Sequence, residues 1–367
     1  MRVLICGPYL SEEMEIKMPE ASPASGKYLR NLIGGLETNG AEVITLSYIT
    51  IPVERRLVED EKRKHSNRHR YIIKDKTVLS SLLKFRKEFK YVARNCQLVI
   101  FYNVSYVMWG LCEYLNHKGI KSLLILADHT DSSEYRSFAR KVITRINEKE
   151  FKVFGNVIIL SPNVKSMLNP DAKIIRMEGG IRIRDYDKCL PLRKKDQFVL
   201  MYSGLLSRVT GVDMLLQAIS INQNRNISFI ITGKGELELE VLTAAKTDSR
   251  IQYLGYVSND EFYNLLNRAD AFVNPRNMSM LQNQNNFPSK VLEYLATGRI
   301  VLSTEFAGYE HFKENFIFYD GRPEKLNELI ENAYVLEEKE RHLIYYQNRK
   351  LAMQYDWDEQ SKKILQE

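Results

Sequence analysis

The sequence predicts an α/β protein built from two domains, each containing a parallel sheet. Short apolar runs alternate with segments of helical periodicity along most of the chain. Strand, helix and strand follow one another within residues 2–46, which is a βαβ unit and implies parallel strands. The chain has 367 residues, a length that suits two domains of ordinary size.

Composition narrows the class of protein. An apolar content of 44% supplies two cores and excludes a disordered chain. No run of about 18 apolar residues occurs, so no membrane-spanning helix is expected. The net charge of 53 − 46 = +7 is mild, which permits a phosphate-bearing substrate or an anionic membrane and does not indicate nucleic acid. The four cysteines show no metal-ligand spacing and are expected to be buried free thiols in a reducing cytoplasm.

The strands are expected where apolar runs end in turn residues. In the first domain these are residues 2–6, 43–46, 98–102, 122–127 and 157–160, and in the second domain 198–202, 227–231, 251–257, 271–273 and 300–302. The N-terminus enters the first strand directly, which is not the pattern of a signal peptide. Ligands of parallel sheets bind at the carboxyl ends of strands, so the loops there are the candidate sites.

One stretch, residues 271–302, carries the clearest chemical signal. The apolar run Ala271–Val273 leads through a polar loop to a helix that is expected to open at Pro288 and to stop at Gly298. Backbone amides at a helix start suit an anion, and Glu293, on the same face as Ser289, suits a ribose diol. Together they indicate a nucleotide-diphosphate site, although a helix opening with a solvated glutamate gives the same pattern.

Residues 287–298 (FPSKVLEYLATG) resemble the donor-binding helix of retaining glycosyltransferases with the GT-B fold, in the family-four group also called glycosyl transferases group 1. The preceding Asn274-Pro275-Arg276 is similar to members that build bacterial capsule and other surface polysaccharides. The group's signature is Glu-x7-Glu. Glu293 matches its second glutamate, which in the family holds the donor ribose, while Asn285 stands at the position of the first.

The resemblance implies two Rossmann-like domains facing a cleft, with the acceptor on the first domain and the donor nucleotide on the second. We expect the first domain to span residues 1–185 and the second 186–351, with 352–367 forming a helix that crosses back onto the first domain. The resemblance covers nearly the whole chain, but its most specific part is residues 274–298.

The turn Ser203–Gly211 resembles the family's phosphate-binding turn, although Leu205 and Thr210 stand at the usual arginine and lysine positions. Other cations must then compensate the diphosphate charge, and those in the converging loops are the candidates. The expected donor-binding residues are Gly204, Arg208, Gly233, Tyr256, Arg276, Asn285, Ser289, Lys290, Val291 and Glu293. Each cation alone is also compatible with an ordinary surface position.

The first domain offers fewer specific signals. Gly7, Ser25 and Gly26 lie in loops at carboxyl ends of strands, where the family's glycine-rich loop approaches donor and acceptor. Asp128 and His129 follow the strand 122–127 and are the candidate catalytic residues, since they place an acid and an imidazole at a strand end. A plain βα loop and a structural histidine are the competing interpretations.

No cofactor and no metal site are expected. Asp185-x-Asp187 and Asp356-x-Asp358 have the spacing of a metal-binding motif of another glycosyltransferase fold, but neither follows a strand that would aim it at a site. We therefore interpret both as chance occurrences.

Residues 54–76 form a charged block rich in Lys and Arg, followed by apolar residues within 79–89. A solvated surface is one interpretation. A basic and apolar face that binds anionic lipid is the other, typical of a cytoplasmic enzyme that is peripheral on the inner face of the cytoplasmic membrane.

The predicted function is transfer of a sugar from a nucleotide-sugar donor to a hydroxyl of a glycan or lipid-linked acceptor, with retention of configuration. A degenerate GT-B subunit that binds nucleotide or glycan without turnover is the alternative, which Leu205, Thr210 and Asn285 favour. An epimerase or phosphorylase of similar fold remains a third class, but the sequence shows neither its usual carboxylate set nor a cofactor lysine. Sugar, base and acceptor are not identified by the sequence.

Overall fold

The chain folds into two compact units. The computed structural model describes residues 1–18, 20, 23–65, 68–127, 132, 135–177, 179–191, 197–280, 283–284 and 286–366. One unit contains Met1–Gly180 together with Trp357–Glu367, and the other contains Ile181–Asp356. Each unit has its own sheet and its own core, and the two are described separately.

The second unit is closed where the chain enters and leaves it. The backbone N–H of Ile181 donates to the carbonyl of Tyr355 at 2.8 Å, and the N–H of Ile183 donates to the Asp356 carboxylate at 3.0 Å. These bonds pair the first residues of the unit with its last. The boundaries that the sequence predicts, at 185 and 352, fall a few residues inside this pairing.

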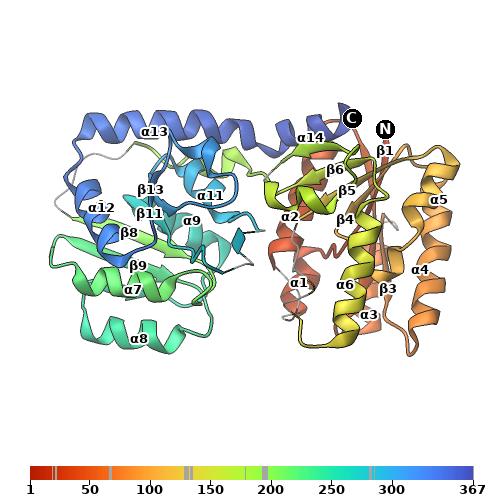
Figure 1. The fold of residues 1–367 in the computed structure, drawn as a ribbon, viewed down its shortest axis with the longest axis horizontal. Coiled ribbons are helices and arrows are strands. Elements are labelled where there is room, and N and C mark those ends of the chain that lie inside the picture. Colours follow the sequence, from red (N-terminus) through yellow and green to blue (C-terminus); the bar gives the residue numbers. More distant parts are fainter. Residues whose placement is uncertain are drawn as a thin grey trace. The chain divides into compact units, whose positions relative to one another are not determined.

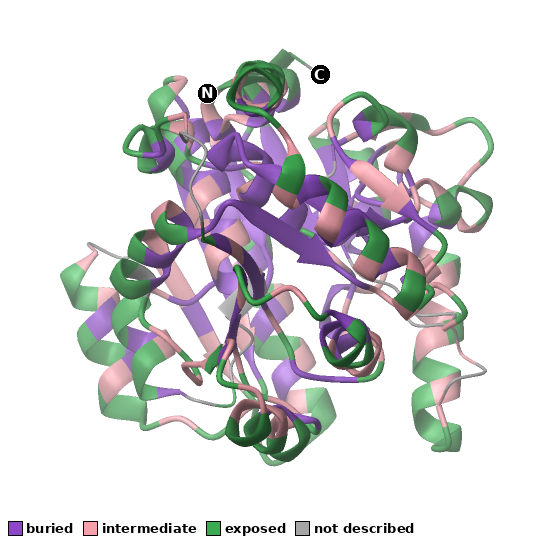
Figure 2. Cartoon of the chain, turned by 90° about the vertical axis from the view of Figure 1, so that its left-hand side faces the viewer, coloured by how far each residue is buried: buried purple, intermediate pink, exposed green. Residues whose placement is uncertain are grey.

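The sheet of the first unit is parallel throughout its recorded pairings and has the order β3-β2-β1-β4-β5-β6-β7 (Figure 1). Its strands are β1 (Arg2–Cys6), β2 (Glu42–Ile49), β3 (His69–Ile73), β4 (Leu98–Tyr102), β5 (Lys121–Leu126), β6 (Asn156–Ile159) and β7 (Lys173–Arg176). Every residue of β4 is buried and apolar, and Ser122 is the one polar residue among the five buried residues of β5. This is the sequence pattern of a parallel sheet covered on both faces. Figure 2 shows strands that are largely buried (purple) and helices with exposed outer faces (green).

The helices of the first unit are α1 (Glu12–Lys17), α2 (Pro23–Thr38), α3 (Arg55–Lys64), α4 (Val78–Ala93), α5 (Leu111–Lys118), α6 (Phe138–Phe151) and α14 (Trp357–Gln366). The last of these comes from the end of the chain and packs on α2 (Figure 1). Asn39 donates to the carbonyl of Asp358 at 2.8 Å, and the rings of Tyr28 and Trp357 meet edge to face at 4.9 Å. The predicted return of the C-terminal helix to the first unit is confirmed.

The second unit repeats the architecture with the strand order β10-β9-β8-β11-β12-β13, again parallel. Its strands are β8 (Phe198–Ser203), β9 (Ile227–Thr232), β10 (Ile251–Tyr253), β11 (Ala271–Asn274), β12 (Ile300–Thr304) and β13 (Ile317–Tyr319). Its helices are α7 (Val212–Ile221), α8 (Glu238–Thr247), α9 (Asn259–Arg268), α11 (Lys290–Thr297), α12 (Pro323–Val335) and α13 (Glu338–Ala352). Short 3-10 helices span Tyr106–Met108, Pro162–Met167, Ile183–Tyr186, Tyr309–Phe312 and Met353–Tyr355.

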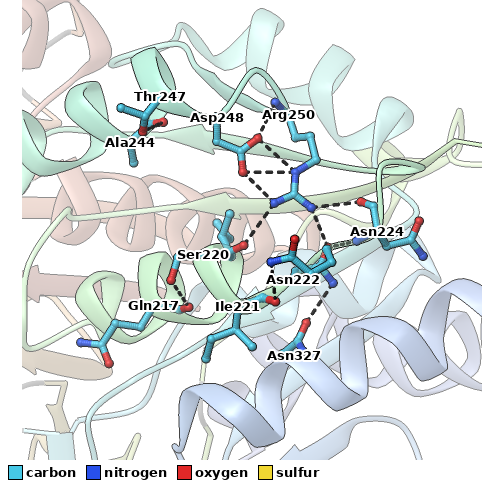
Figure 3. Close-up of polar contacts among 12 residues, drawn as sticks. Gln217, Ser220, Ile221, Asn222, Asn224, Ala244, Thr247, Asp248, Arg250 and Asn327 are labelled. Carbon is cyan, nitrogen blue, oxygen red and sulfur yellow. Dashed lines mark hydrogen bonds and ion pairs between the residues drawn. The ribbon is translucent and has the colours of Figure 1, made fainter.

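Arg250, whose side chain is largely buried, joins three elements at the end of the second sheet where β10 begins. Arg250 donates to the Asp248 carboxylate at 2.6 Å through Nη2 and to the Asn222 side chain at 2.7 Å through Nη1 (Figure 3). Asn222 in turn donates to Asn327 at 2.9 Å and to Glu331 at 2.6 Å, both on α12. The network therefore fixes the start of β10, the loop after α7 and the helix α12 to one another.

The predicted α/β class with two parallel sheets is confirmed, and differences from the predicted elements are local. The structure adds the strands β3, β7 and β13 and the short helix α1, where the sequence indicated charged, linker or loop segments. The strand predicted at residues 251–257 is also shorter in the structure, because β10 ends at Tyr253.

Candidate active site

The second sheet has a topological switch beside β8. Its neighbours are β9, which follows it in the chain, and β11, which is reached only after β10 and α9. Loops that leave such a pair of strands turn to opposite faces of the sheet, and the gap between them is where ligands of open α/β sheets bind. The predicted donor residues lie on the loops that follow β8, β9 and β11 and on α11.

The loops after β8 and β9 touch through their glycines. The Gly204 N–H donates to the Thr232 carbonyl at 3.1 Å, and the Gly233 N–H donates to the Gly255 carbonyl at 2.8 Å. Gly233 has a φ of +128°, and a Cβ at this position would lie 1.8 Å from the Gly204 carbonyl oxygen. No other residue fits there, so this close approach explains why the sequence carries glycine at position 233.

The turn after β8 also contacts the loop after β11. Gly211 has a φ of +74°, and a Cβ there would lie 1.7 Å from the Pro275 carbonyl oxygen. Val209 accepts hydrogen bonds on its carbonyl from the Asn277 N–H at 3.3 Å and from the Asn283 side chain at 2.7 Å. The segments that the sequence predicted to converge are thus packed against one another.

Arg208 lies in this turn with its side chain largely exposed. Its guanidinium is 3.3 Å from the Asp213 carboxylate, and its backbone N–H donates to Glu236 at 3.1 Å. Thr210, at the family's lysine position, is used inside the turn, since its hydroxyl donates to the Leu205 carbonyl at 2.5 Å. Arg208 is therefore the cation that this turn offers to a ligand.

Helix α11 begins later than the sequence predicts. Ser289 is its N-cap and Lys290 its first residue, so Pro288 precedes the helix and does not occupy its first position. The Val291 N–H donates to the Pro288 carbonyl at 2.9 Å, which closes a turn before the regular helix. Ser289 is exposed and Val291 is fully buried, so Ser289 can reach a ligand with its side chain whereas Val291 contributes packing.

Tyr294 fixes α11 to the end of β8, a role that the sequence did not reveal. Its hydroxyl accepts from the Ser203 N–H and donates to the Ser203 carbonyl, each at 3.1 Å. Its ring stacks on Phe272 with 4.5 Å between centroids. These contacts hold α11 beside the end of β8, next to the turn that begins at Gly204.

Glu293 and Lys290 form an ion pair on α11. The Lys290 Nζ lies 3.1 Å from the Glu293 carboxylate and 4.3 Å from the centre of the Phe262 ring. The Glu293 side chain is 12% exposed and that of Lys290 is 42% exposed. Burial, together with the Glu293 charge, raises the pKa of the Tyr186 hydroxyl, so the Glu293 carboxylate lies near Tyr186.

Arg276 and Tyr256 occupy the rims of this region. The Arg276 guanidinium donates to Asn283 at 3.2 Å and to the Asn286 carbonyl at 3.3 Å, so it organises the loop that leads to α11. It also lines a pocket of about 680 Å³ at the carboxyl ends of β11, β12 and β13. Tyr256, after Gly255, is 69% exposed.

Residues 187–350 match the family described as glycosyl transferases group 1. This range spans the sheet of the second unit with its glycine turns and α11. These residues form a group 1 glycosyltransferase domain. No curated protein matches the chain in sequence.

Several solved structures match nearly the whole chain, both units included. They share its fold at low sequence identity. HepE from Anabaena in complex with UDP has a TM-score of 0.71 and 15% identity, with 100% of each chain covered. Sucrose-phosphate synthase from Thermosynechococcus elongatus has a TM-score of 0.69 and 14% identity, covering 100% of this chain and 98% of that one. The N-terminal domain of trehalose-6-phosphate phosphatase from Candida albicans has a TM-score of 0.73 and 12% identity, covering 99% and 95%.

In the first unit, the predicted loop residues lie at the carboxyl end of β1 and on the first turn of α2. Gly7 follows β1, and a Cβ there would lie 2.9 Å from the Cβ of Tyr102. Gly26 is buried against the ion pair of Arg30 with Glu15, in which the two side chains are 2.5 Å apart. Ser25 is half-buried beside it. The candidate catalytic residues Asp128 and His129 lie outside the described residues, as does Asn285 of the donor set.

The acidic pairs with metal-like spacing have protein partners. Asp187 pairs with Arg349 at 2.9 Å, Asp185 accepts from the Tyr263 hydroxyl at 3.1 Å, and Asp356 accepts from the Ile183 N–H at 3.0 Å. Within the described ranges, no three acidic, histidine or cysteine side chains cluster as metal ligands would. In the same part of the chain, no helix is both long and apolar enough to cross a bilayer.

Proposed function

We propose that the protein transfers a sugar from a nucleoside-diphosphate sugar to a hydroxyl of a glycan or lipid-linked acceptor. The observation that carries this proposal is the close approach of the Gly204 and Gly233 turns at the switch point of the glycosyltransferase domain, with Tyr294 of α11 bonded to Ser203 beside Gly204. Backbone that approaches so closely leaves room for a diphosphate, and an acidic side chain lies one turn further along α11.

Each polar group of this site has a defined task in the proposal. Glu293 accepts hydrogen bonds from the ribose hydroxyls, while Lys290, Arg208 and the amides at the start of α11 face the diphosphate. Arg208 exchanges its contact with Asp213, 3.3 Å away in a solvent-exposed pair, for a phosphate oxygen at little cost. In the reaction the acceptor oxygen bonds to the anomeric carbon, and the bond from that carbon to the phosphate oxygen breaks. The released nucleoside diphosphate keeps the electron pair of that bond and takes up the proton of the acceptor hydroxyl.

The main catalytic effect of the domain is then electrostatic. Negative charge grows on the leaving diphosphate, and fixed donors around it stabilise the transition state more than the bound substrate. No covalent nucleophile is invoked, and Asp128 and His129 remain the proposed catalytic groups on the acceptor side. Retention of configuration and a role in bacterial capsule or other surface-polysaccharide synthesis are part of the proposal through the resemblance of residues 274–298.

The proposed reaction needs no metal. The acidic pairs with suitable spacing are engaged by Arg349, Tyr263 and the Ile183 N–H. Turnover is therefore expected to persist in EDTA. Loss of turnover in EDTA that magnesium or manganese restores would contradict this part of the proposal and return Asp185 and Asp187 to consideration.

A binding subunit without turnover is the second candidate. It is favoured by Thr210, whose hydroxyl is bonded within its own turn, and by Leu205, whose side chain is 59% exposed and offers no charge. Such a subunit would bind nucleoside diphosphates with the same residues but release none from a donor.

One screen separates the two functions. The protein is incubated with UDP- and GDP-sugars, with and without lipid-linked acceptors, and the released nucleotide is measured. Acceptor-dependent release supports transfer, and proton NMR of the new glycosidic bond then reports retention or inversion. Binding of nucleotide by calorimetry without release from any donor would favour the binding subunit.

A further inference from the structure

Helix α6 is attached to the first unit only near its C-terminal end. Of its residues, all of which the structure describes, Phe151 alone is buried. Asn147 accepts from the Trp109 indole at 2.7 Å and Glu150 accepts from the Gly110 N–H at 2.9 Å. The N-terminal half of α6 makes no comparable attachment within the described chain, and Figure 1 shows the helix along the surface of its unit.

This unattached half exposes a stripe of large apolar side chains. Phe138 is 81% exposed, and Val142 and Ile143 are each 38% exposed. Their spacing places them on one face of a helix, which Ala139 and Ile146 extend. Isolated exposed apolar residues are ordinary, but a contiguous stripe on one helix marks a surface that is covered by a partner.

The charges around the stripe identify the kind of partner. Arg136, Arg140, Lys141 and Arg145 flank it, and the sequence contains no Asp or Glu from Tyr135 to Asn147. Within the helix, Lys141 and Arg145 are a like-charged pair four residues apart, which destabilises a helix. Cations at a helix N-terminus also oppose its dipole.

The N-terminal half of α6 has little packing and several positive charges, so we expect a partner surface to stabilise it. A short helix is marginal in water even with a favourable sequence, and tertiary packing normally supplies the difference. An anionic surface with an apolar interior satisfies both features, because it neutralises the cations and takes up the apolar stripe.

The block within residues 54–76 is a weaker candidate for the same contact. Lys64 lies 2.7 Å from Glu13 and Arg68 lies 2.5 Å from Glu37, while Arg70 pairs with Glu88. These acidic partners neutralise much of the charge that the sequence shows there.

We propose that α6 docks on an anionic lipid bilayer, with Phe138, Val142 and Ile143 in the headgroup–acyl boundary and Arg140, Lys141 and Arg145 on the phosphates. This inference rests on the proposed function only in that a lipid-linked acceptor would lie in the same membrane. The docking surface belongs to the first unit, so lipid binding and donor turnover are measured independently.

The test is cosedimentation of the full chain with vesicles of phosphatidylcholine alone or mixed in equal parts with phosphatidylglycerol. Wild-type protein is expected to bind the mixed vesicles, less as salt rises, and to bind neutral vesicles poorly. The triple change Arg140→Gln, Lys141→Gln, Arg145→Gln should weaken binding on the order of a hundredfold, because each basic residue near such a surface contributes roughly fivefold. Lys62→Gln, Arg63→Gln, Lys64→Gln removes the same charge from α3 and is the matched control, expected to change binding little.

A direct readout of insertion comes from Phe138→Trp, whose added emission should shift to the blue with mixed vesicles and not with neutral ones. Equal losses in the α6 and α3 triple variants would overturn the proposal, since net charge alone would then explain binding. An unshifted Phe138→Trp spectrum in a bound, folded variant would overturn it as well. Nucleotide release without lipid is measured on the wild type and on every variant. If the glycosyl-transfer proposal is wrong, the wild type itself releases no nucleotide. If the docking proposal is wrong, nucleotide release is unaffected and only the binding to vesicles differs from the expected result.

Discussion

Glu293 has a strong partner in Lys290 before any ligand arrives. The two side chains are 3.1 Å apart and the carboxylate is 12% exposed, so both its charge and its direction are set. A carboxylate held in this way binds a ribose diol without first paying the entropy of ordering itself.

Glu293→Gln should weaken binding of a nucleoside diphosphate by about 1–3 kcal/mol, the range for a hydrogen bond to a charged group. Calorimetry with UDP and GDP measures the loss. Glu240→Gln, an exposed glutamate on α8, is the control and should leave affinity unchanged. Unaltered affinity in a folded Glu293→Gln variant would remove Glu293 from the site.

The unfolding free energy of the first unit should depend on pH through His69. Its ring lies tilted against Tyr9 with 4.5 Å between centroids. Burial first, and then the nearby His65 and Arg68 charges, lower the pKa of His69 to about 4. A lowered histidine pKa means that the unfolded chain takes up the proton first as pH falls. Stability is therefore lost as pH falls from about 6.5 toward 4.

The expected loss between pH 7 and 4.5 is on the order of 1–2 kcal/mol after allowance for the partial exposure of the ring. Urea titration followed by tryptophan fluorescence measures it in the first unit, because Trp109 and Trp357 both belong to that unit. A His69→Gln variant should lack this component. A variant with the wild-type slope would show that other groups cause the acid sensitivity.

At the scale of elements, the glycine turns determine whether the donor site forms. Gly233→Ala would place a Cβ 1.8 Å from the Gly204 carbonyl oxygen at a φ of +128°, so the β8 and β9 loops must separate. We expect a loss of about 2 kcal/mol or more in unfolding free energy and a larger loss of nucleotide affinity. Gly34→Ala on α2 has no atom within 4 Å and should be neutral or stabilise by up to about 1 kcal/mol. Equal effects of the two changes, by urea titration and calorimetry, would contradict the close approach.

The hydrogen bonds of Arg250 should contribute to the stability of the second unit. The side chains of Arg250 and Asp248 are 9% and 21% exposed, whereas those of Arg322 and Asp320 are 70% and 48% exposed (Figure 3 shows the first pair). Arg250→Met should cost about 2–4 kcal/mol, because Asp248 and Asn222 lose a buried partner. Arg322→Met should cost no more than about 1 kcal/mol. Urea titration followed by circular dichroism compares them, and similar costs would show that Arg250 is not structurally important.

At the scale of the whole molecule, the sequence predicted the class and the central strands because these are long buried apolar runs. Each strand that it missed lies at an edge: β3 and β7 border the first sheet and β13 borders the second. An edge strand is half exposed, so polar residues such as His69 and Arg70 in β3 hide its pattern. The start of α11 was misplaced because Pro288 suits both the first helical position and the residue before the cap.

The candidate site was predictable in part for a similar reason. Glycine turns, Glu293 and Lys290 stand out in sequence because few other residues serve their roles. Tyr294 did not, since a tyrosine on an apolar helix face is typical of any core, and only the structure shows its hydroxyl on both backbone groups of Ser203. The partner Asp213 of Arg208 was also invisible, because an acid in a helix's first turn is common.

The central claim is that the donor nucleotide binds within the glycosyltransferase domain, at the switch point beside β8. Hydrogen exchange of the full chain with and without UDP, and separately GDP, tests it most directly. The claim predicts that one of these ligands slows exchange in residues 203–211, 232–236 and 288–293, with little change in β1 to β7 of the first unit. Protection confined to the first unit, or bound nucleotide that leaves residues 203–211 and 288–293 unprotected, would contradict it.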